Sequence, residues 1–218
     1  MTRPRPAEAQ PPGRTRDREA TREALMAAAT ELFASLGYAG ATVHAIAAHA
    51  RVNKAMINYH FAGKHGLYTE ILRRDFDWAL TRLAELEREP LRADAKLARF
   101  VAIFGELHQR RPNLSTMMLR EAMSGGRWLE PSLLPDFKRI YGTVEAIVRQ
   151  GVDEGTFREV NALFMHHTVM GCLAFFFAAR PMRERMIAEG LVPVPRPDPE
   201  AFVAHVQDLL ARGLAKEP

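Results

Sequence analysis

The sequence predicts an all-α protein, and three observations support this fold class. Apolar residues recur at intervals of three or four along most of the 218-residue chain, which is the pattern of helices with one buried face. No segment shows the apolar and polar alternation that predicts a strand. Proline and glycine separate the apolar stripes and so divide the chain into short helices. A chain of this length can bury the core of one or two domains.

The composition excludes several classes of protein. Hydrophobic residues make up 47% and charged residues 26% of the chain, which is typical of a globular protein rather than a disordered or collagen-like one. The single cysteine, Cys172, excludes a framework of intramolecular disulfides. The longest apolar stretch, about residues 168–179, is shorter than the roughly 18 to 20 residues of a membrane span. The amino terminus also lacks the apolar segment of a secretory signal, so we expect a cytoplasmic protein with no membrane partner.

The excess positive charge lies at the start of the chain. Residues 1–65 contain nine Lys and Arg and five acidic residues, whereas residues 66–218 contain 21 of each sign. A basic module in front of an electrically neutral body suggests a polyanionic partner.

The first residues predict an arm followed by a helix. Residues 1–16 combine prolines and arginines with few apolar side chains, so we expect a flexible arm. From Asp17 an apolar stripe at helical spacing runs to Leu36, and Gly37 follows as a stop signal.

Two short helices follow in close succession. Thr42 is a good N-cap for a helix that ends at Ala50, and Asn53 is another for a helix over residues 54–60. Helices this short, joined this tightly, predict a helix-turn-helix unit within a first domain at residues 17–65.

Residues 66–218 predict a larger helical domain. A long helix begins at Lys64 and ends near Pro90. Further helices are expected at residues 92–110, 113–124, 132–154, 160–179 and 198–213. Residues 184–189 add a helical turn or two, and the proline-rich residues 193–197 form an extended connector.

The second short helix exposes side chains that suit the major groove of DNA. Ile57 faces the core and leaves four residues on the outer face, namely Lys54, Ala55, Asn58 and Tyr59. Lys54 can donate to guanine or phosphate, and the small Ala55 lets the backbone approach base edges. Asn58 can read a base or bind phosphate, and Tyr59 can donate to the DNA backbone.

Three neighbouring residues have both a DNA-binding and a structural interpretation. Thr42 and Lys64 stand at the starts of helices, where a hydroxyl, an ammonium and backbone N–H groups can hold phosphates. Thr42 would nevertheless cap its helix without DNA, and Lys64 could be a solvated charge. His60 is expected to pack and hydrogen-bond rather than read bases. The arginines of the arm could enter a minor groove, although a solvated tail is the simpler expectation.

The helix-turn-helix segment resembles the amino-terminal DNA-binding domain of the TetR family of bacterial transcriptional regulators. The resemblance rests on the runs 42–47, 53–61 and 64–67 and covers about residues 20–70. It implies an all-helical homodimer that binds a palindromic operator in double-stranded DNA with its third helix in the major groove. It also implies that the larger domain binds a small-molecule effector and dimerises.

The resemblance further implies that Thr42, Tyr59 and Lys64 contact phosphates, while Lys54 and Ala55 face base edges.

The chain departs from the family pattern at two positions. Arg51 occupies a turn position that is usually glycine in the family, so a positive φ there would cost roughly 1 kcal/mol of strain. Asn58 stands where many members have an aromatic residue, which leaves its role as a base or a phosphate contact open.

The larger domain has more large apolar side chains than a single helix stripe needs, as in an adaptable pocket for a partly apolar effector. The candidate pocket residues are Phe100, Phe104, Met117, Met118, Arg120, Glu121, Trp128, Met170 and Phe175. Arg120 and Glu121 would be polar anchors, because charged groups on a largely apolar helix need partners. The alternatives are core or dimer packing for the apolar residues and ordinary ion pairs for the two charged ones.

The helices at 160–179 and 198–213 predict a dimer surface. Their candidate interface residues are Leu163, Phe164, His167, Met170, Ala174, Phe202, Val206, Leu209 and Leu210. Two such helices from each subunit can form a four-helix interface. The family resemblance favours this interpretation, whereas the periodicity alone also allows an internal core.

We expect no metal, no cofactor and no enzymatic activity. His166 and His167 diverge by about 100° on a helix, and Cys172 follows His167 by five residues rather than by the four that share a helix face. The chain has no phosphate-binding glycine loop, nucleophile elbow or catalytic dyad, which disfavours a helical enzyme with an accessory DNA-binding segment.

The expected function is therefore a ligand-responsive transcriptional regulator, a repressor that a small-molecule effector releases from its operator. The alternative is a non-inducible DNA-binding or architectural protein whose helical domain serves only dimerisation or partner binding.

Overall fold

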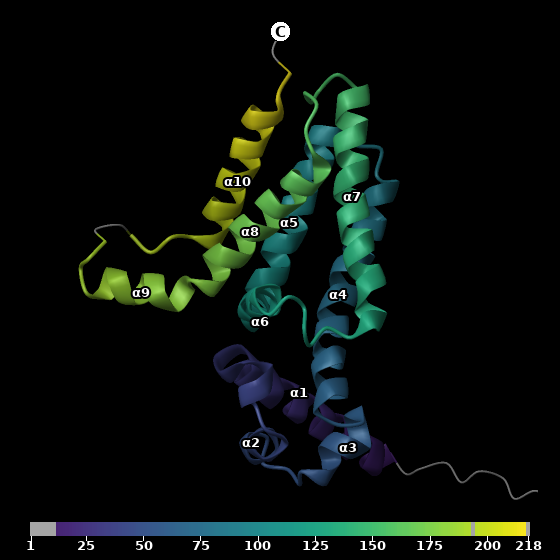
Figure 1. The fold of residues 1–218 in the computed structure, drawn as a ribbon, viewed down its shortest axis with the longest axis vertical. Coiled ribbons are helices and arrows are strands. Elements are labelled where there is room, and N and C mark those ends of the chain that lie inside the picture. The colour runs from purple at the N-terminus through teal and green to yellow at the C-terminus, as the bar shows by residue number, and fades with distance from the viewer. Residues whose placement is uncertain (1–11, 193–194, 217–218) are drawn as a thin grey trace, which may run out of the picture. The chain divides into compact units, whose positions relative to one another are not determined.

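A computed structural model describes residues 12–192 and 195–216, and within them it contains ten α-helices and one short 3-10 helix (Figure 1). In chain order these are α1 (Pro12–Gly40), α2 (Val43–His49), α3 (Ala55–Phe61), α4 (Lys64–Arg88), α5 (Ala93–Arg110), α6 (Pro112–Met123), η1 (Pro131–Leu133), α7 (Leu134–Asp153), α8 (Ala162–Ala178), α9 (Arg180–Ala188) and α10 (Pro199–Leu214). The only β-type pairing in the described ranges is an isolated antiparallel bridge between Phe157 and Ala215. The predicted all-α fold class is confirmed.

The chain divides into two compact units, Met1–Tyr68 and Thr69–Pro218. The division falls within α4, three residues after the predicted domain boundary at residue 65. We refer to them as the amino-terminal and the carboxy-terminal unit.

The first helix begins earlier than the sequence predicted. Residues 1–11 of the expected arm lie outside the described residues, but residues 12–16 already belong to α1. Proline is tolerated in the first turn of a helix because the N–H that it lacks has no partner there, so Pro12 does not prevent an early start. The predicted stop at Gly37 is present as a break inside α1, with φ 73° and ψ 171°.

The amino-terminal unit has a small core in which α1 packs against both α2 and α3. Leu25, Ala29 and Phe33 of α1 are buried, as are Ile46 of α2 and Ile57 of α3. These apolar residues recur at helical spacing, which explains why each helix turns one face inward.

The carboxy-terminal unit is a bundle centred on α5, which contacts α6, α7, α8 and α10 (Figure 1). Phe100 and Val101 of α5 are completely buried. Gly105 allows α10 to approach closely, because a Cβ there would lie 2.5 Å from Cγ2 of Val203.

Two segments of this unit differ from the sequence prediction. The expected turn at residues 184–189 is a nine-residue helix, α9, that begins at Arg180. Pro181 follows the helix predicted at residues 160–179 and was expected to end it, but it occupies the first turn of α9, where proline is favourable. The helix predicted from residue 132 starts with the short 3-10 helix η1 and becomes α-helical at Leu134.

Within residues 12–192 and 195–216, no single helix is long and apolar enough to cross a bilayer. Only α8 and α9 taken together reach that length and composition, with a bend of 50° between them.

Candidate nucleic-acid interface

The turn between α2 and α3 closes with two backbone hydrogen bonds. The N–H of Val52 donates to the carbonyl of Ala47 over 3.0 Å, and the N–H of Arg51 donates to that of Ala48 over 3.1 Å. This pairing is a Schellman motif, which requires a left-handed residue after the helix end. Arg51 is that residue, with φ 55°. The chain therefore places arginine in a conformation that glycine adopts without strain.

Side-chain caps fix the starts of both short helices. Thr42 Oγ1 accepts a hydrogen bond from the N–H of Ala45 over 3.1 Å, and Asn53 Oδ1 accepts one from the N–H of Ala55 over 2.9 Å. Such caps satisfy backbone donors that have no partner within the helix. The hydroxyl proton of Thr42 remains available, because the cap uses only a lone pair of its oxygen.

The outer face of α3 carries the predicted DNA-contacting residues. Ile57 is fully buried, whereas Lys54, Ala55 and Asn58 are exposed. Tyr59 has 62% of its surface exposed, although large apolar rings are normally covered. An exposed row of a cation, a methyl group, an amide and a phenol on one short helix matches the groups that contact DNA bases and phosphates.

Lys64 has an intramolecular partner that the sequence did not predict. Its Nζ donates to the carbonyl of Tyr38 over 2.9 Å and lies 4.3 Å from the centroid of the Tyr38 ring. Burial lowers the pKa of the Lys64 ammonium. Lys64 thus links the start of α4 to the end of α1, and two of its three N–H groups remain for another acceptor.

Two arginines of α1 lie beside α3. Arg18 Cζ is 5.3 Å from the centroid of the Tyr59 ring, and Arg22 Cζ is 5.5 Å from that of Phe61. The sequence prediction counts Arg18 among the arginines of the arm although it starts the helix at Asp17, and in the structure Arg18 belongs to α1. A signal was present, because residues 18, 22, 25 and 29 follow one another at helical spacing.

His60 is half-buried and lies edge-on to Tyr59, with the ring centroids 5.0 Å apart. Burial, followed by the positive charges of Arg18 and Arg22, lowers the pKa of His60. The ring is therefore neutral at pH 7 and supports Tyr59 by packing.

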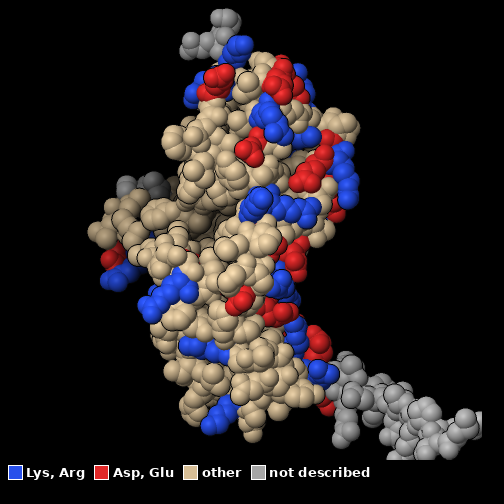
Figure 2. All heavy atoms as spheres, turned by 45° about the vertical axis from the view of Figure 1, so that its right-hand side comes forward, with Lys and Arg blue, Asp and Glu red and all other residues tan. Residues whose placement is uncertain are grey.

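The distribution of charged side chains does not by itself mark the candidate DNA-binding surface. On the face drawn in Figure 2, Lys and Arg side chains are interspersed with Asp and Glu rather than gathered in one large patch. The shape of the helix-turn-helix and the side chains of α3 carry the assignment instead.

The predicted pocket residues of the carboxy-terminal unit are dispersed. Four are buried, namely Phe100, Phe104, Met117 and Glu121; Met118, Trp128 and Met170 are half-buried; Arg120 and Phe175 are exposed. None of the nine lines the cavity of about 320 Å³ at the ends of α5 and α8 or the cavity of similar size between α8 and α10. Glu121 is tied locally, because its Oε2 accepts a hydrogen bond from the N–H of Trp128 over 3.2 Å.

The predicted dimer residues divide between surface and core. Leu163, Phe164, His167 and Leu209 are exposed; Met170, Ala174 and Phe202 are half-buried; Val206 and Leu210 are buried. Phe164 leaves 70% of its surface exposed. Phe175, predicted for the pocket, is 64% exposed and follows Phe164 and His167 at helical spacing on α8. We call the four exposed apolar side chains Leu163, Phe164, Phe175 and Leu209 the α8–α10 face.

The residues considered for a metal do not cluster. Within the described ranges, no group of three or more His, Cys, Asp or Glu side chains is placed to hold a metal ion. His167 Nδ1 lies 2.8 Å from the carbonyl of Leu163, and Cys172 is exposed. His166 packs edge-on against Tyr141, with the ring centroids 5.9 Å apart.

Comparisons with known proteins agree with this architecture. The family model described as bacterial regulatory proteins, tetR family, matches residues 25–71, and that of the tetracyclin repressor-like C-terminal domain matches residues 94–193. Together the two models match more than half of the chain.

Individual relatives have low sequence identity to this chain but align with most of its length. The HTH-type transcriptional repressor NicS of Pseudomonas putida is 24% identical over 208 residues, which cover 93% of this chain and 96% of NicS. The HTH-type transcriptional regulator RutR of Escherichia coli is 26% identical over 148 residues, which cover 68% of this chain and 69% of RutR. The structure of the ketosteroid transcriptional regulator KstR2 of Mycobacterium tuberculosis shares the fold, with a TM-score of 0.71 at 18% identity over 90% of this chain and 95% of that one.

Proposed function

Because the chain belongs to the TetR family of bacterial transcriptional regulators, we propose that it is a cytoplasmic repressor that binds a palindromic operator as a homodimer and is released by a small-molecule effector. The relative NicS is described as a repressor, which supports this direction of control. The relatives NicS and RutR are both described as transcriptional regulators.

The exposed row on α3 carries the DNA-binding part of the proposal. Lys54 and Asn58 are placed to donate to base edges or phosphates, and Ala55 leaves room for close approach to the groove. Tyr59 and Thr42 offer hydroxyl donors to phosphates on either side. Lys64 holds α4 against α1 and so positions α3, in addition to any phosphate contact.

The α8–α10 face supports the homodimer. Its four apolar side chains are exposed on neighbouring helices, and such clusters mark sites of protein association. A two-fold dimer places two α3 helices on two half-sites, so the operator should be a palindrome whose half-sites are one helical turn or a multiple apart.

Effector control requires that the ligand bind two arrangements of the protein with different affinities. Helix α4 starts in the amino-terminal unit and continues through the carboxy-terminal unit, so it is the covalent route by which a ligand bound in one unit can alter the other. A ligand with equal affinity for both arrangements would not release the operator.

Selection of genomic fragments tests this function. We would incubate the purified full chain with fragmented DNA from its own source, recover the bound fragments and sequence them. We expect enrichment of a palindrome, including fragments upstream of the protein's own reading frame. Recovery of unrelated fragments with no shared motif would contradict the proposal. An operator whose affinity no metabolite changes would favour the non-inducible alternative.

A further inference from the structure

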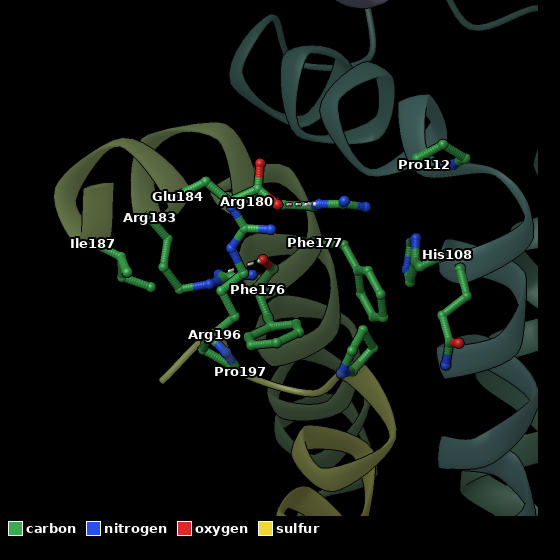
Figure 3. A pocket seen from close by; sticks show the side chains of 12 residues that line it. His108, Pro112, Phe176, Phe177, Arg180, Arg183, Glu184, Ile187, Arg196 and Pro197 are labelled. Atoms are coloured by element: carbon green, nitrogen blue, oxygen red, sulfur yellow. Dashed lines mark hydrogen bonds and ion pairs between the residues drawn. The ribbon is translucent and has the colours of Figure 1, made fainter. Parts of the chain in front are cut away.

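The carboxy-terminal unit contains a cavity of about 320 Å³ that the DNA-binding site does not use. It lies where the last residues of α5 and α8 meet α9 and the start of α10 (Figure 3). Its volume is at the lower end of the range for small-molecule sites. We call it the α9 cavity.

The walls of the α9 cavity carry more positive than negative charge. Among the described residues that line it, Arg180, Arg183 and Arg196 face a single carboxylate, that of Glu184. Arg180 Nε donates to Glu184 Oε1 over 2.8 Å, and this hydrogen bond holds the pKa of Glu184 below its usual value. Glu184 is therefore charged at neutral pH and compensates one arginine only.

Arg183 is the most constrained of the three arginines. Its Nη1 donates to the carbonyl of Phe176 over 2.9 Å, and its Cζ lies 4.2 Å from the centroid of the Phe176 ring. Its Nε is buried and donates to none of the described residues. A buried donor without an acceptor is unfavourable by itself and points to a missing partner. An anion is such a partner, because an arginine can offer two parallel N–H groups to a carboxylate.

Arg196 adds a second guanidinium without a strong partner. No hydrogen bond or close ion pair joins it to any described residue, and its charge acts on Glu184 only from a longer distance. Figure 3 shows the arginines of α9 and of the connector on one side of the cavity and Phe177 with His108 on the other. The cationic groups therefore gather at one end of the space.

The opposite wall is flat and uncharged. The rings of Phe177 and His108 stack with their centroids 5.4 Å apart and an interplanar angle of 28°. Burial lowers the pKa of His108 to about 4, and its Nδ1 lies 2.8 Å from Ser115 Oγ. His108 is thus a neutral ring at physiological pH. Phe176 stacks on Phe202, with the centroids 3.8 Å apart, and thereby supports Arg183 on its other face.

We propose that the α9 cavity binds a small organic anion with a planar apolar body, whose anionic group is held by Arg183 and Arg196 while its body lies against Phe177 and His108. The arginines neutralise the anion where water is partly excluded, and the rings contribute apolar contact. Binding at this site does not depend on the proposed regulatory function. The further consequence, that such an anion is the effector, rests on that function.

Calorimetric titration of the full chain with 2-naphthoate tests the proposal. The matched probes are 2-naphthamide, which has the same ring system without the charge, and acetate, which has the charge without the rings. We expect one 2-naphthoate per chain and an affinity at least about tenfold above that of either control. 2-Naphthamide should bind more weakly because a charge-assisted hydrogen bond contributes more than a neutral one, and acetate because it lacks the apolar contact of the rings. Equal binding of 2-naphthoate and 2-naphthamide, or no binding of 2-naphthoate, would overturn the proposal.

Variants locate the binding site. Arg183→Gln and Arg196→Gln should each weaken 2-naphthoate binding about tenfold or more, and Arg183→Lys should restore part of the affinity because it keeps the charge. Arg185→Gln is the matched control, since Arg185 also lies on α9 but is exposed, pairs with Glu189 over 2.7 Å and does not line the cavity. If Arg183→Gln impairs folding, Arg196→Gln decides the outcome. An unchanged affinity in Arg196→Gln, or an equal loss in Arg185→Gln, would contradict the assignment.

A parallel measurement separates the two proposals. Operator binding in the absence of ligand tests the regulator, and calorimetry without DNA tests the cavity, so either can fail alone. If both succeed, saturating 2-naphthoate either changes the operator affinity, which supports the effector role, or leaves it unchanged, which refutes that role only.

Discussion

Arg51 closes the helix-turn-helix with a left-handed backbone, φ 55°. A side chain with a Cβ is strained there, whereas glycine is not. We predict that Arg51→Gly stabilises the amino-terminal unit by roughly 1 kcal/mol relative to Arg51→Ala, because both variants lose the same charge and only one loses the strain. Native-state hydrogen exchange of the α2 and α3 amides measures this difference. Slower exchange in Arg51→Ala than in Arg51→Gly would contradict the strain.

Asp75 is a buried carboxylate of α4 that lies 3.0 Å from Arg111 Nε. Burial raises its pKa to about 6, although the charges of Arg111 and Arg74 oppose the shift. In the unfolded chain the carboxyl releases its proton near pH 4. Between about pH 4 and pH 6 the native state therefore holds a proton that the unfolded state has lost, so stability falls as pH rises.

We predict that Asp75→Asn removes this dependence. The wild type should lose roughly 2 kcal/mol relative to the variant between pH 4 and pH 7. Denaturant unfolding followed by tryptophan fluorescence is suitable, because both tryptophans, Trp78 and Trp128, lie in the carboxy-terminal unit. A difference in unfolding free energy that is constant across this range would show that Asp75 titrates normally.

Among the helices, the start of α4 depends on a glycine. A Cβ at Gly66 would collide with the backbone carbonyl of Phe61, the last residue of α3. This carbonyl is backbone and cannot rotate away. We predict that Gly66→Ala displaces α3 and destabilises the amino-terminal unit by about 2 kcal/mol or more.

Gly142→Ala is the matched control for Gly66→Ala. Gly142 is within α7, and no atom outside the neighbouring backbone of that helix lies within 4 Å of the added methyl group, so this substitution should stabilise the helix by about 0.5 to 1 kcal/mol. Thermal unfolding and hydrogen exchange of both variants would test the contrast. Equal changes in stability in the two variants would mean that the structure around Gly66 accommodates the methyl group without loss of stability.

Most helices could be predicted from the sequence because their signals are local. Apolar spacing and caps such as Thr42 and Asn53 operate within a few residues. Two signals were ambiguous for the same reason, since proline both ends helices and begins them. Pro12 thus stands in a first turn inside the expected arm, and Pro181 stands in a first turn where a break was expected.

The sites were less predictable because they depend on contacts between distant segments. Lys64 meets the carbonyl of Tyr38 across 26 positions, and no spacing rule connects them. Similarly, Arg183 and Arg196 come together with His108 only through the path of the chain between α8 and α10. The sequence marked aromatic residues such as Phe100 as pocket candidates, but apolar residues satisfy a core and a pocket equally well, and Phe100 is fully buried.

For the molecule as a whole, we expect operator binding to depend on dimerisation. We predict that Phe164→Glu yields monomers, because it places a charge in the α8–α10 face. Operator affinity should fall by more than about tenfold, since a monomer contacts one half-site only. Sedimentation and operator titration measure both effects.

Met123→Glu is the control for dimerisation, since Met123 is 89% exposed on α6 and lies outside the α8–α10 face. It should remain dimeric and bind the operator normally. If the Phe164→Glu protein remains dimeric, the dimer interface lies outside the α8–α10 face.

The central claim, that the exposed face of α3 reads DNA, is tested most directly by one titration. The dissociation constants of the wild type and Tyr59→Ala are compared on the selected operator and on a scrambled duplex of equal length and salt concentration. We predict that the wild type prefers the operator by about a thousandfold or more, and that Tyr59→Ala weakens operator binding at least about tenfold. Equal, weak binding of the wild type to both duplexes, or an unchanged operator affinity in Tyr59→Ala, would contradict the account.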